Sequence, residues 1–304
     1  MHRLFDDYIA VDWSAAARPT TGANSIWVAL RNRDERLQYQ TISRNPKTRL
    51  EARALVLQLL QQRIARGNKV LVGFDFAFGY PAGTAAAAKL PRADVAPWRA
   101  MYDHLSAQVK EREDNSNTRF EIAANLNKTI SQGSHPFWGT PKSRQTPTLA
   151  MKKGDFSAPN SLPEHRKAEA WIKSNFKAHP KSVWQLLGAG AVGSQALLGI
   201  PTVQYLRREI PGARIWPFET GFKALQSKDL ADVSCVFAEI YPSTVQITPK
   251  TGEILDEMQV RILSKHLESL DSAGDLADAF GPPDTLSGRE IAEITCEEGW
   301  ILAK

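Results

Sequence analysis

The chain has 304 residues, of which 42% are hydrophobic and 23% charged, a composition that is typical of folded globular proteins and excludes disordered or fibrous chains. No apolar run approaches the ~20 residues of a membrane helix, and acidic residues interrupt the region where a signal peptide needs an apolar core. Two cysteines, Cys235 and Cys296, are too few for a disulfide framework. We therefore expect a cytoplasmic protein that does not bind membranes.

The first 80 residues predict three strands, a helix and a fourth strand. Residues 7–13 and 69–76 are mostly apolar, as strands buried on both faces are. Residues 25–30 and 37–42 predict two further strands, because turn-forming residues separate them and the second alternates in polarity. A helix begins after Asn45-Pro46 and ends at Gly67, with apolar residues spaced three and four apart.

The rest of the chain divides into a helical middle and a mixed end. Helices are expected at 98–113, 118–130, 164–176 and 193–208, with an aperiodic stretch at 131–163. Short strands at 213–218 and 235–241 precede a helix at about 254–270. The predicted organisation is a core of residues 1–80 and 211–304, into which a helical segment of residues 81–210 is inserted.

Four acidic residues fall where strands or helices meet the expected functional edge. Asp12 and Asp75 end the first and fourth strands, Glu239 lies near the end of the last strand, and Asp256 begins the last long helix. The carboxyl ends of parallel strands open onto the functional crevice of an α/β sheet. Because unpaired buried carboxylates are costly, a cluster of them indicates a cation, and oxygen ligands favour Mg²⁺ or Mn²⁺. Such ions can activate a water for phosphodiester cleavage.

The order of elements resembles the RNase H-like fold, and the motifs resemble the domain-of-unknown-function 429 family of predicted nucleases. The resembling stretches are YIAVDWSAAA, VGFDFAFGYP, HPFWG, KSVWQLLGAGAVGSQ, ARIWPFETG, AEIYPS, LDEMQVRIL and EEGWIL. The resemblance implies an α/β fold with a mixed five-stranded sheet, and a metal-dependent nuclease in which Asp12, Asp75 and Asp256 are catalytic, with Glu239 as a fourth acid. The RNase H acid of the first helix has one counterpart here, Glu51.

Basic residues of the middle segment are candidates for nucleic-acid binding. Residues 142–181 contain nine Lys or Arg against three Asp or Glu, whereas residues 235–304 contain five against thirteen. Basic side chains contact phosphates and aromatic side chains stack on bases. The candidate substrate-binding residues are Ser14, Trp138, Lys142, Arg144, Lys152 and Lys153, and Arg166 and Lys167 are further phosphate contacts.

Three alternatives stay open. Gly188, Gly190 and Gly193 stand in the GxGxxG order of a dinucleotide-binding loop, but Pro201 interrupts the following helix, so no cofactor-binding residue is predicted. The stretch DWSAAARPTTGAN could form the phosphate-binding hairpin of a sugar-kinase or actin-like protein, although that architecture needs two copies of the fold. The third alternative is a catalytically inactive adaptor whose basic surface binds nucleic acid.

Overall fold

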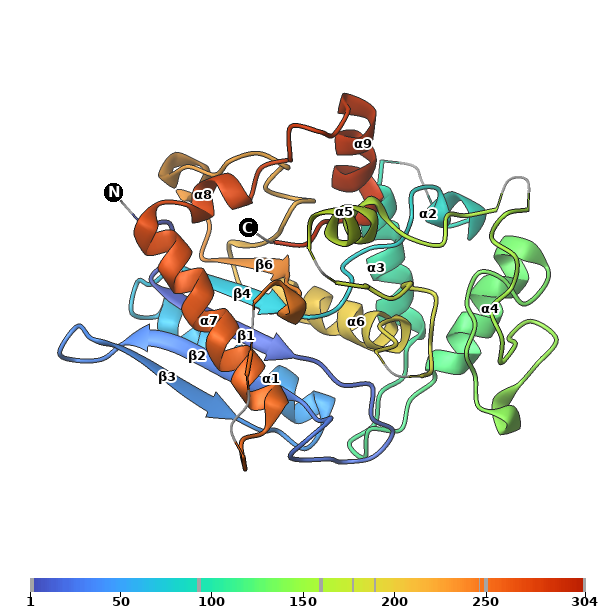
Figure 1. The fold of residues 1–304 in the computed structure, drawn as a ribbon, viewed down its shortest axis with the longest axis horizontal. Coiled ribbons are helices and arrows are strands. Elements are labelled where there is room, and N and C mark those ends of the chain that lie inside the picture. The colour runs from blue at the N-terminus through green and yellow to red at the C-terminus, as the bar shows by residue number, and fades with distance from the viewer. Residues whose placement is uncertain are drawn as a thin grey trace.

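The computed structural model of the protein describes residues 3–91, 94–158, 161–176, 178–188, 190–245, 247–248 and 251–302. Within these residues the chain forms a mixed sheet of six strands in the order β3-β2-β1-β4-β6-β5 (Figure 1). The strands are β1 (Asp7–Asp12), β2 (Trp27–Arg33), β3 (Tyr39–Arg44), β4 (Val70–Phe74), β5 (Ala213–Ile215) and β6 (Cys235–Glu239). β1, β2 and β3 pair antiparallel, whereas β1, β4, β6 and β5 pair in parallel.

The α/β class and the change from antiparallel to parallel pairing are confirmed, but the expected number of five strands is wrong. The count of five came from the resemblance. The strand expected at 213–218 is present as the three-residue strand β5, which pairs in parallel with β6 and is the sixth strand, at the edge. β2 and β3 also begin two residues later than expected, at Trp27 and Tyr39. Short strands and strand ends depend on pairing with distant segments, which local patterns do not record.

Helices cover both faces of the sheet. The described helices are α1 (Arg49–Ile64), α2 (Thr84–Ala87), α3 (Pro97–Gln108), α4 (Arg119–Ser131), α5 (Lys167–Asn175), α6 (Gly193–Glu209), α7 (Leu255–Ala273), α8 (Leu276–Ala279) and α9 (Gly288–Glu293). A π-helical turn, η4 (Ile294–Glu298), follows α9. α6 continues through Pro201, so the expected interruption there is wrong. None of the helices within the described ranges is long and apolar enough to cross a membrane.

Two hydrophobic cores lie on opposite faces of the sheet. Successive strand residues point to opposite faces, and Ile9 and Val11 accordingly pack in one core, whereas Tyr8 and Ala10 pack in the other. The first core contains the buried sides of α1, α3 and α6. The second contains the buried side of α7, which crosses β1, β2 and β3 in Figure 1.

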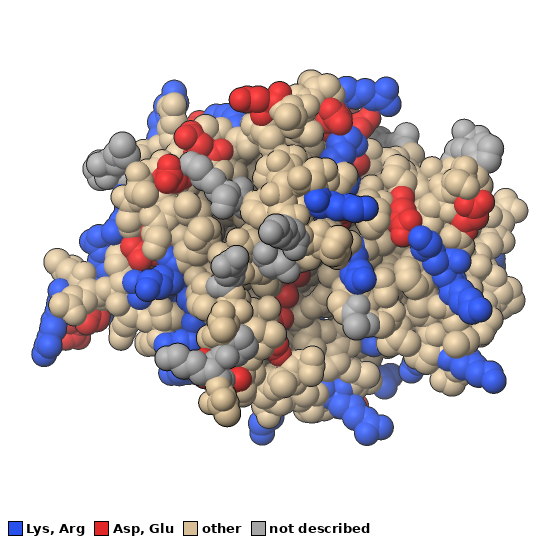
Figure 2. Space-filling view, viewed as in Figure 1, with Lys and Arg blue, Asp and Glu red and all other residues tan. Residues whose placement is uncertain are grey.

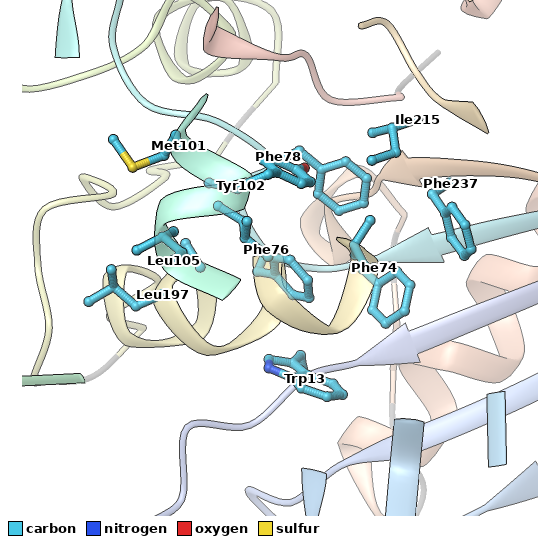
Figure 3. Packing of buried hydrophobic residues seen from close by; sticks show 14 of the residues in the cluster. Trp13, Phe74, Phe76, Phe78, Met101, Tyr102, Leu105, Leu197, Ile215 and Phe237 are labelled. Carbon is cyan, nitrogen blue, oxygen red and sulfur yellow. The ribbon is translucent and has the colours of Figure 1, made fainter. Parts of the chain in front are cut away.

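An aromatic cluster joins the sheet to the helices of residues 81–210. Figure 3 shows Trp13, Phe74, Phe76 and Phe78 beside Tyr102 of α3 and Leu197 of α6. The ring centroids of Phe74 and Phe76 are 5.4 Å apart. A Cβ atom on Gly199 of α6 would lie 2.3 Å from Cζ of Phe76, so glycine allows this close approach. The segment of residues 81–210 therefore shares one hydrophobic core with the sheet.

Candidate acidic site

Asp12 and Asp75 meet at the carboxyl ends of two paired strands. Asp12 ends β1, and Asp75 follows Phe74, the last residue of β4, which is paired with Val11. The two side chains form a hydrogen bond with each other. The backbone N–H of Trp13 donates to Oδ1 of Asp75 at 2.7 Å, which fixes this carboxyl against the start of the next loop.

Both carboxyls hold protons more strongly than ordinary aspartic acids. Burial raises the pKa of Asp12, and the charges of Asp75 and Asp256 raise it further. Burial also raises the pKa of Asp75, although the hydrogen bond from Trp13 acts in the opposite direction. Because two neighbouring carboxyls titrate as a unit, the pair retains a proton at neutral pH. An ion with two positive charges could take the place of that proton.

Asp256 contributes a third carboxyl from the first turn of α7. Its Oδ2 atom accepts a hydrogen bond from the backbone N–H of Asn24 at 2.5 Å, and its charge acts on both Asp12 and Asp75. Nevertheless, no group of three or more His, Cys, Asp or Glu side chains in the described part of the chain is arranged so that it could hold a metal ion. The acidic site therefore consists of a hydrogen-bonded pair, Asp12 and Asp75, with Asp256 at its edge.

Glu239 belongs to a different cluster, so its expected place in the acidic site is corrected. Arg166 donates to both carboxylate oxygens of Glu239, at 2.6 and 2.8 Å, and also binds Glu169. The backbone N–H of Phe78 donates to Glu239 Oε2 at 3.0 Å. Burial alone would lower the pKa of Arg166, but the charges of Glu169 and Glu239 hold it well above its ordinary value. Glu239 is thus neutralised by an arginine that is itself 1% exposed.

Glu51, the candidate acid of the first helix, has a structural role. Its carboxylate accepts a hydrogen bond from the backbone N–H of Lys47 at 2.9 Å, and Thr48 caps the same helix end. The Thr48 hydroxyl in turn accepts the backbone N–H of Glu51 at 3.2 Å, so these bonds hold the start of the helix. Glu51 is exposed and supplies no contact to the acidic pair.

The loop after β1 is held by a buried arginine that sequence analysis did not identify. Arg49 donates to the carbonyl oxygens of Ser14 and Ala16 at 3.0 and 2.7 Å. It also binds Glu111, with N–O distances of 2.7 and 2.8 Å. Ser14 lies next to the acidic pair in the chain, and its hydroxyl donates to the carbonyl of Asn24 at 3.3 Å. This loop is therefore fixed at both Ser14 and Asn24.

The basic candidates of the middle segment differ in their partners. Arg144 forms an ion pair with Glu121, and Lys153 forms one with Glu164. Lys142 and Lys152 are exposed. Figure 2 shows acidic side chains in a hollow near the middle of one face, with Lys and Arg scattered around it. The basic segment therefore does not present its full charge as one surface.

Three further candidates, Arg166, Lys167 and Trp138, are either buried or already paired with acidic side chains. Arg166 is enclosed with Glu169 and Glu239, so its assignment as a phosphate contact is wrong. Lys167 forms ion pairs with Glu293 and Glu298. Trp138 is partly buried against the first core, and its indole nitrogen has no hydrogen-bond partner. The spacing of Arg166 and Glu169, three residues apart, was the one local sign of this pairing.

The glycine-rich loop lacks the surroundings of a dinucleotide site. Residues 182–186, which precede it, form a turn and a single β-bridge rather than a strand. A Cβ atom on Gly193 would lie 2.5 Å from the carbonyl oxygen of Val183, so this glycine is needed for close packing at the start of α6. Ala189 lies outside the described residues.

Comparison with family models, with curated proteins and with solved structures finds no match for this chain. The resemblance to the domain-of-unknown-function 429 family therefore stays a prediction from the sequence.

Proposed function

We propose that the protein is a divalent-metal-dependent nuclease with an RNase H-like fold, in which Asp12, Asp75 and Asp256 are the catalytic acids. The observation that supports this proposal is the half-buried Asp12–Asp75 pair, in which burial raises the pKa of both carboxyls and on which the charge of Asp256 acts. Glu239 is left out of the ligand set because Arg166 already binds both of its oxygens.

The acidic site offers carboxylate oxygens, which are the type of ligand that Mg²⁺ and Mn²⁺ prefer. Asp12 and Asp75 would hold the ion, and Asp256 would bind it from the first turn of α7. The chemistry that the ion supplies when bound is activation of a water and stabilisation of charge on the reacting phosphate.

The protein's own groups keep the acids and the substrate in place. Trp13 N–H orients Asp75, Asn24 N–H orients Asp256, and Arg49 holds the loop that connects them. Ser14 is near enough in the chain to contact a phosphate at the acidic pair. Lys142 and Lys152, which are exposed, would bind the phosphates of a nucleic acid farther from the acids.

The test is cleavage of labelled single- and double-stranded DNA and RNA with Mg²⁺, with Mn²⁺ and with EDTA. We expect cleavage with either ion and none with EDTA, and we expect Asp12→Asn and Asp75→Asn to abolish it. Asp6→Asn, at the opposite end of β1, is the matched control and should cleave normally. Metal-independent cleavage, or cleavage that survives Asp12→Asn, would refute the proposal.

The arrangement of the acids also favours a second candidate, an inactive nucleic-acid-binding adaptor. The described residues contain no group of three side chains ready to hold a metal. Salt-sensitive binding of an oligonucleotide, with no cleavage and no rise in melting temperature on adding Mg²⁺ or Mn²⁺, would identify the adaptor.

A further inference from the structure

A cavity of about 740 Å³ lies at the end of the sheet opposite the acidic site. Arg3, Arg33, Arg63 and Arg66 line it together with Tyr39. β1 runs from Asp7, which also lines the cavity, to Asp12. At the usual rise of a strand, about 17 Å separates these two ends. The arginine cavity and the acidic site are therefore distinct places on the molecule.

One arginine of the cavity lining, Arg63, is held in one orientation. Arg63 donates from Nε and Nη2 to the two carboxylate oxygens of Asp7, at 2.6 and 3.0 Å. Asn68 donates to the same carboxylate at 2.7 Å. Arg63 is 8% exposed and Asp7 is 1% exposed. The third nitrogen of Arg63, Nη1, takes part in neither of these bonds.

Tyr39 organises two more guanidinium groups at the side of the cavity. The central carbons of Arg3 and Arg33 lie 4.8 and 5.2 Å from the centre of its ring. Such contacts hold arginine side chains in place without neutralising their charge. Among the ion pairs of the described residues, Arg3 contacts Glu268, whereas neither Arg33 nor Arg66 has a carboxylate partner. These two arginines also line a second cavity of about 470 Å³.

The acids that line the main cavity are already hydrogen-bonded. Asp7 is bound by Arg63 and Asn68. Asp34 accepts the backbone N–H groups of Arg36 and Gln38, at 2.9 and 2.8 Å, within its own turn. Asp6 accepts the backbone N–H of Lys69 at 2.9 Å. The carboxylates thus stabilise the walls, while Arg33 and Arg66 stay available to an anion.

We propose that this arginine cavity is a binding site for a phosphate-bearing anion. Planar guanidinium groups bind phosphate through paired hydrogen bonds, and the volume is in the range of small-molecule sites. Phosphate could come from a free phosphorylated small molecule or from the backbone of a nucleic acid. The site does not depend on the proposed nuclease activity.

The test is calorimetric titration of the full chain with pyrophosphate, followed by competition with a single-stranded oligonucleotide. We expect pyrophosphate to bind, and Arg33→Ala/Arg66→Ala to weaken its binding at least ~10-fold, since each substitution removes charge-assisted hydrogen bonds. Arg112→Ala/Lys173→Ala removes two exposed charges elsewhere and should leave affinity unchanged. Asp12→Asn should also leave it unchanged, which separates this site from the acidic one.

The competition identifies the source of the phosphate. Displacement of pyrophosphate by the oligonucleotide, lost in Arg33→Ala/Arg66→Ala, assigns the site to a nucleic-acid backbone. Binding of pyrophosphate without displacement assigns it to a small molecule. The proposal is overturned if pyrophosphate does not bind at millimolar concentration, or if it binds the wild-type protein and Arg33→Ala/Arg66→Ala with equal affinity.

Discussion

Two groups of buried acids lie at the same edge of the sheet, and they differ in how their charge is compensated. Glu239, the last residue of β6, is neutralised by Arg166, which binds both of its oxygens. Asp12 ends β1 and Asp75 follows the neighbouring strand β4; these two acids bind each other, and burial raises both of their pKa values. An acid whose charge is already compensated has a structural role, whereas the uncompensated pair is left for a ligand. The position of an acid at a strand end does not distinguish these two cases.

The largest expected effect is the loss of stability when Arg166, which neutralises Glu239, is replaced. Arg166→Met would leave Glu169 and Glu239 buried without a counter-charge, which typically costs ~3–5 kcal/mol. Urea denaturation should show this loss in the free energy of unfolding. Arg289→Met removes an arginine that is 88% exposed in its side chain and pairs with Glu293, and it should cost less than ~1 kcal/mol. Similar stabilities of the two variants would contradict the comparison.

The uncompensated pair predicts a pH dependence of stability in metal-free protein. Burial raises the pKa of Asp75 to about 7 and that of Asp12 to about 10, so the native state binds more protons than the unfolded chain above about pH 4. Stability from this pair is therefore complete at low pH and is lost as pH rises through those values. The urea midpoint should therefore fall steadily from pH 6 to pH 9, since each pH unit between the unfolded and native pKa values of a carboxyl lowers the free energy of unfolding by about 1.4 kcal/mol.

Two comparisons isolate the pair from other titrating groups. Asp75→Asn should reduce the fall, because it removes one of the two carboxyls. Saturating Mg²⁺ should reduce the fall in stability with pH in the wild-type protein and not in Asp75→Asn. An identical pH profile in both proteins without metal would show that the pair is not coupled.

Asp256 is intermediate between the neutralised Glu239 and the uncompensated Asp12–Asp75 pair. Its carboxylate binds one backbone N–H, and its charge acts on two other acids. We expect Asp256→Asn to raise the Mg²⁺ concentration for half-maximal thermal stabilisation about 10-fold. Glu257→Gln is the matched control, because Glu257 accepts a hydrogen bond from the hydroxyl of Ser43 at 2.5 Å instead. Equal metal dependence in the two variants would remove Asp256 from the ligand set.

The smallest effect concerns the exposed lysines of the middle segment. Lys142→Ala/Lys152→Ala should weaken oligonucleotide binding a few-fold and reduce its dependence on log salt by ~1–2. Arg144→Ala/Lys153→Ala should change affinity less, because each residue already has an acidic partner. Titrations at three salt concentrations measure both slopes. A larger loss of affinity in Arg144→Ala/Lys153→Ala than in Lys142→Ala/Lys152→Ala would show that the ion pairs of Arg144 and Lys153 open when the oligonucleotide binds.

Much of the sheet could be predicted from the sequence because its strands carry strong local patterns. Apolar residues 7–13 and 69–76 indicated buried strands, and parallel pairing of β1 with β4 then brings Asp12 and Asp75 together. The strand expected at 213–218 is also present as β5, but it ends at Ile215, where its pairing with β6 ends, and the local pattern did not predict that end.

The errors in the site come from long-range partners. Arg166 lies 73 residues before Glu239 in the chain, and no local pattern shows that the two meet. Its basic charge instead indicated a phosphate contact. Arg49 begins α1, where it could be taken for a surface residue, but it is 1% exposed and binds the loop after β1. Identifying such pairs requires the three-dimensional arrangement of the segments.

The π-helical turn η4 has a consequence for how the chain acquires its structure during synthesis. Glu297 accepts the backbone N–H groups of Gly83 and Ala85, at 2.7 and 2.6 Å, and Glu298 binds that of Ala82 at 3.0 Å. These acceptors are made more than 200 residues after their donors. At ~5–20 residues per second, the start of α2 must wait roughly 10–40 s on the ribosome for its partners. A chaperone that shields the unfinished helices during this interval should therefore increase the yield of folded protein.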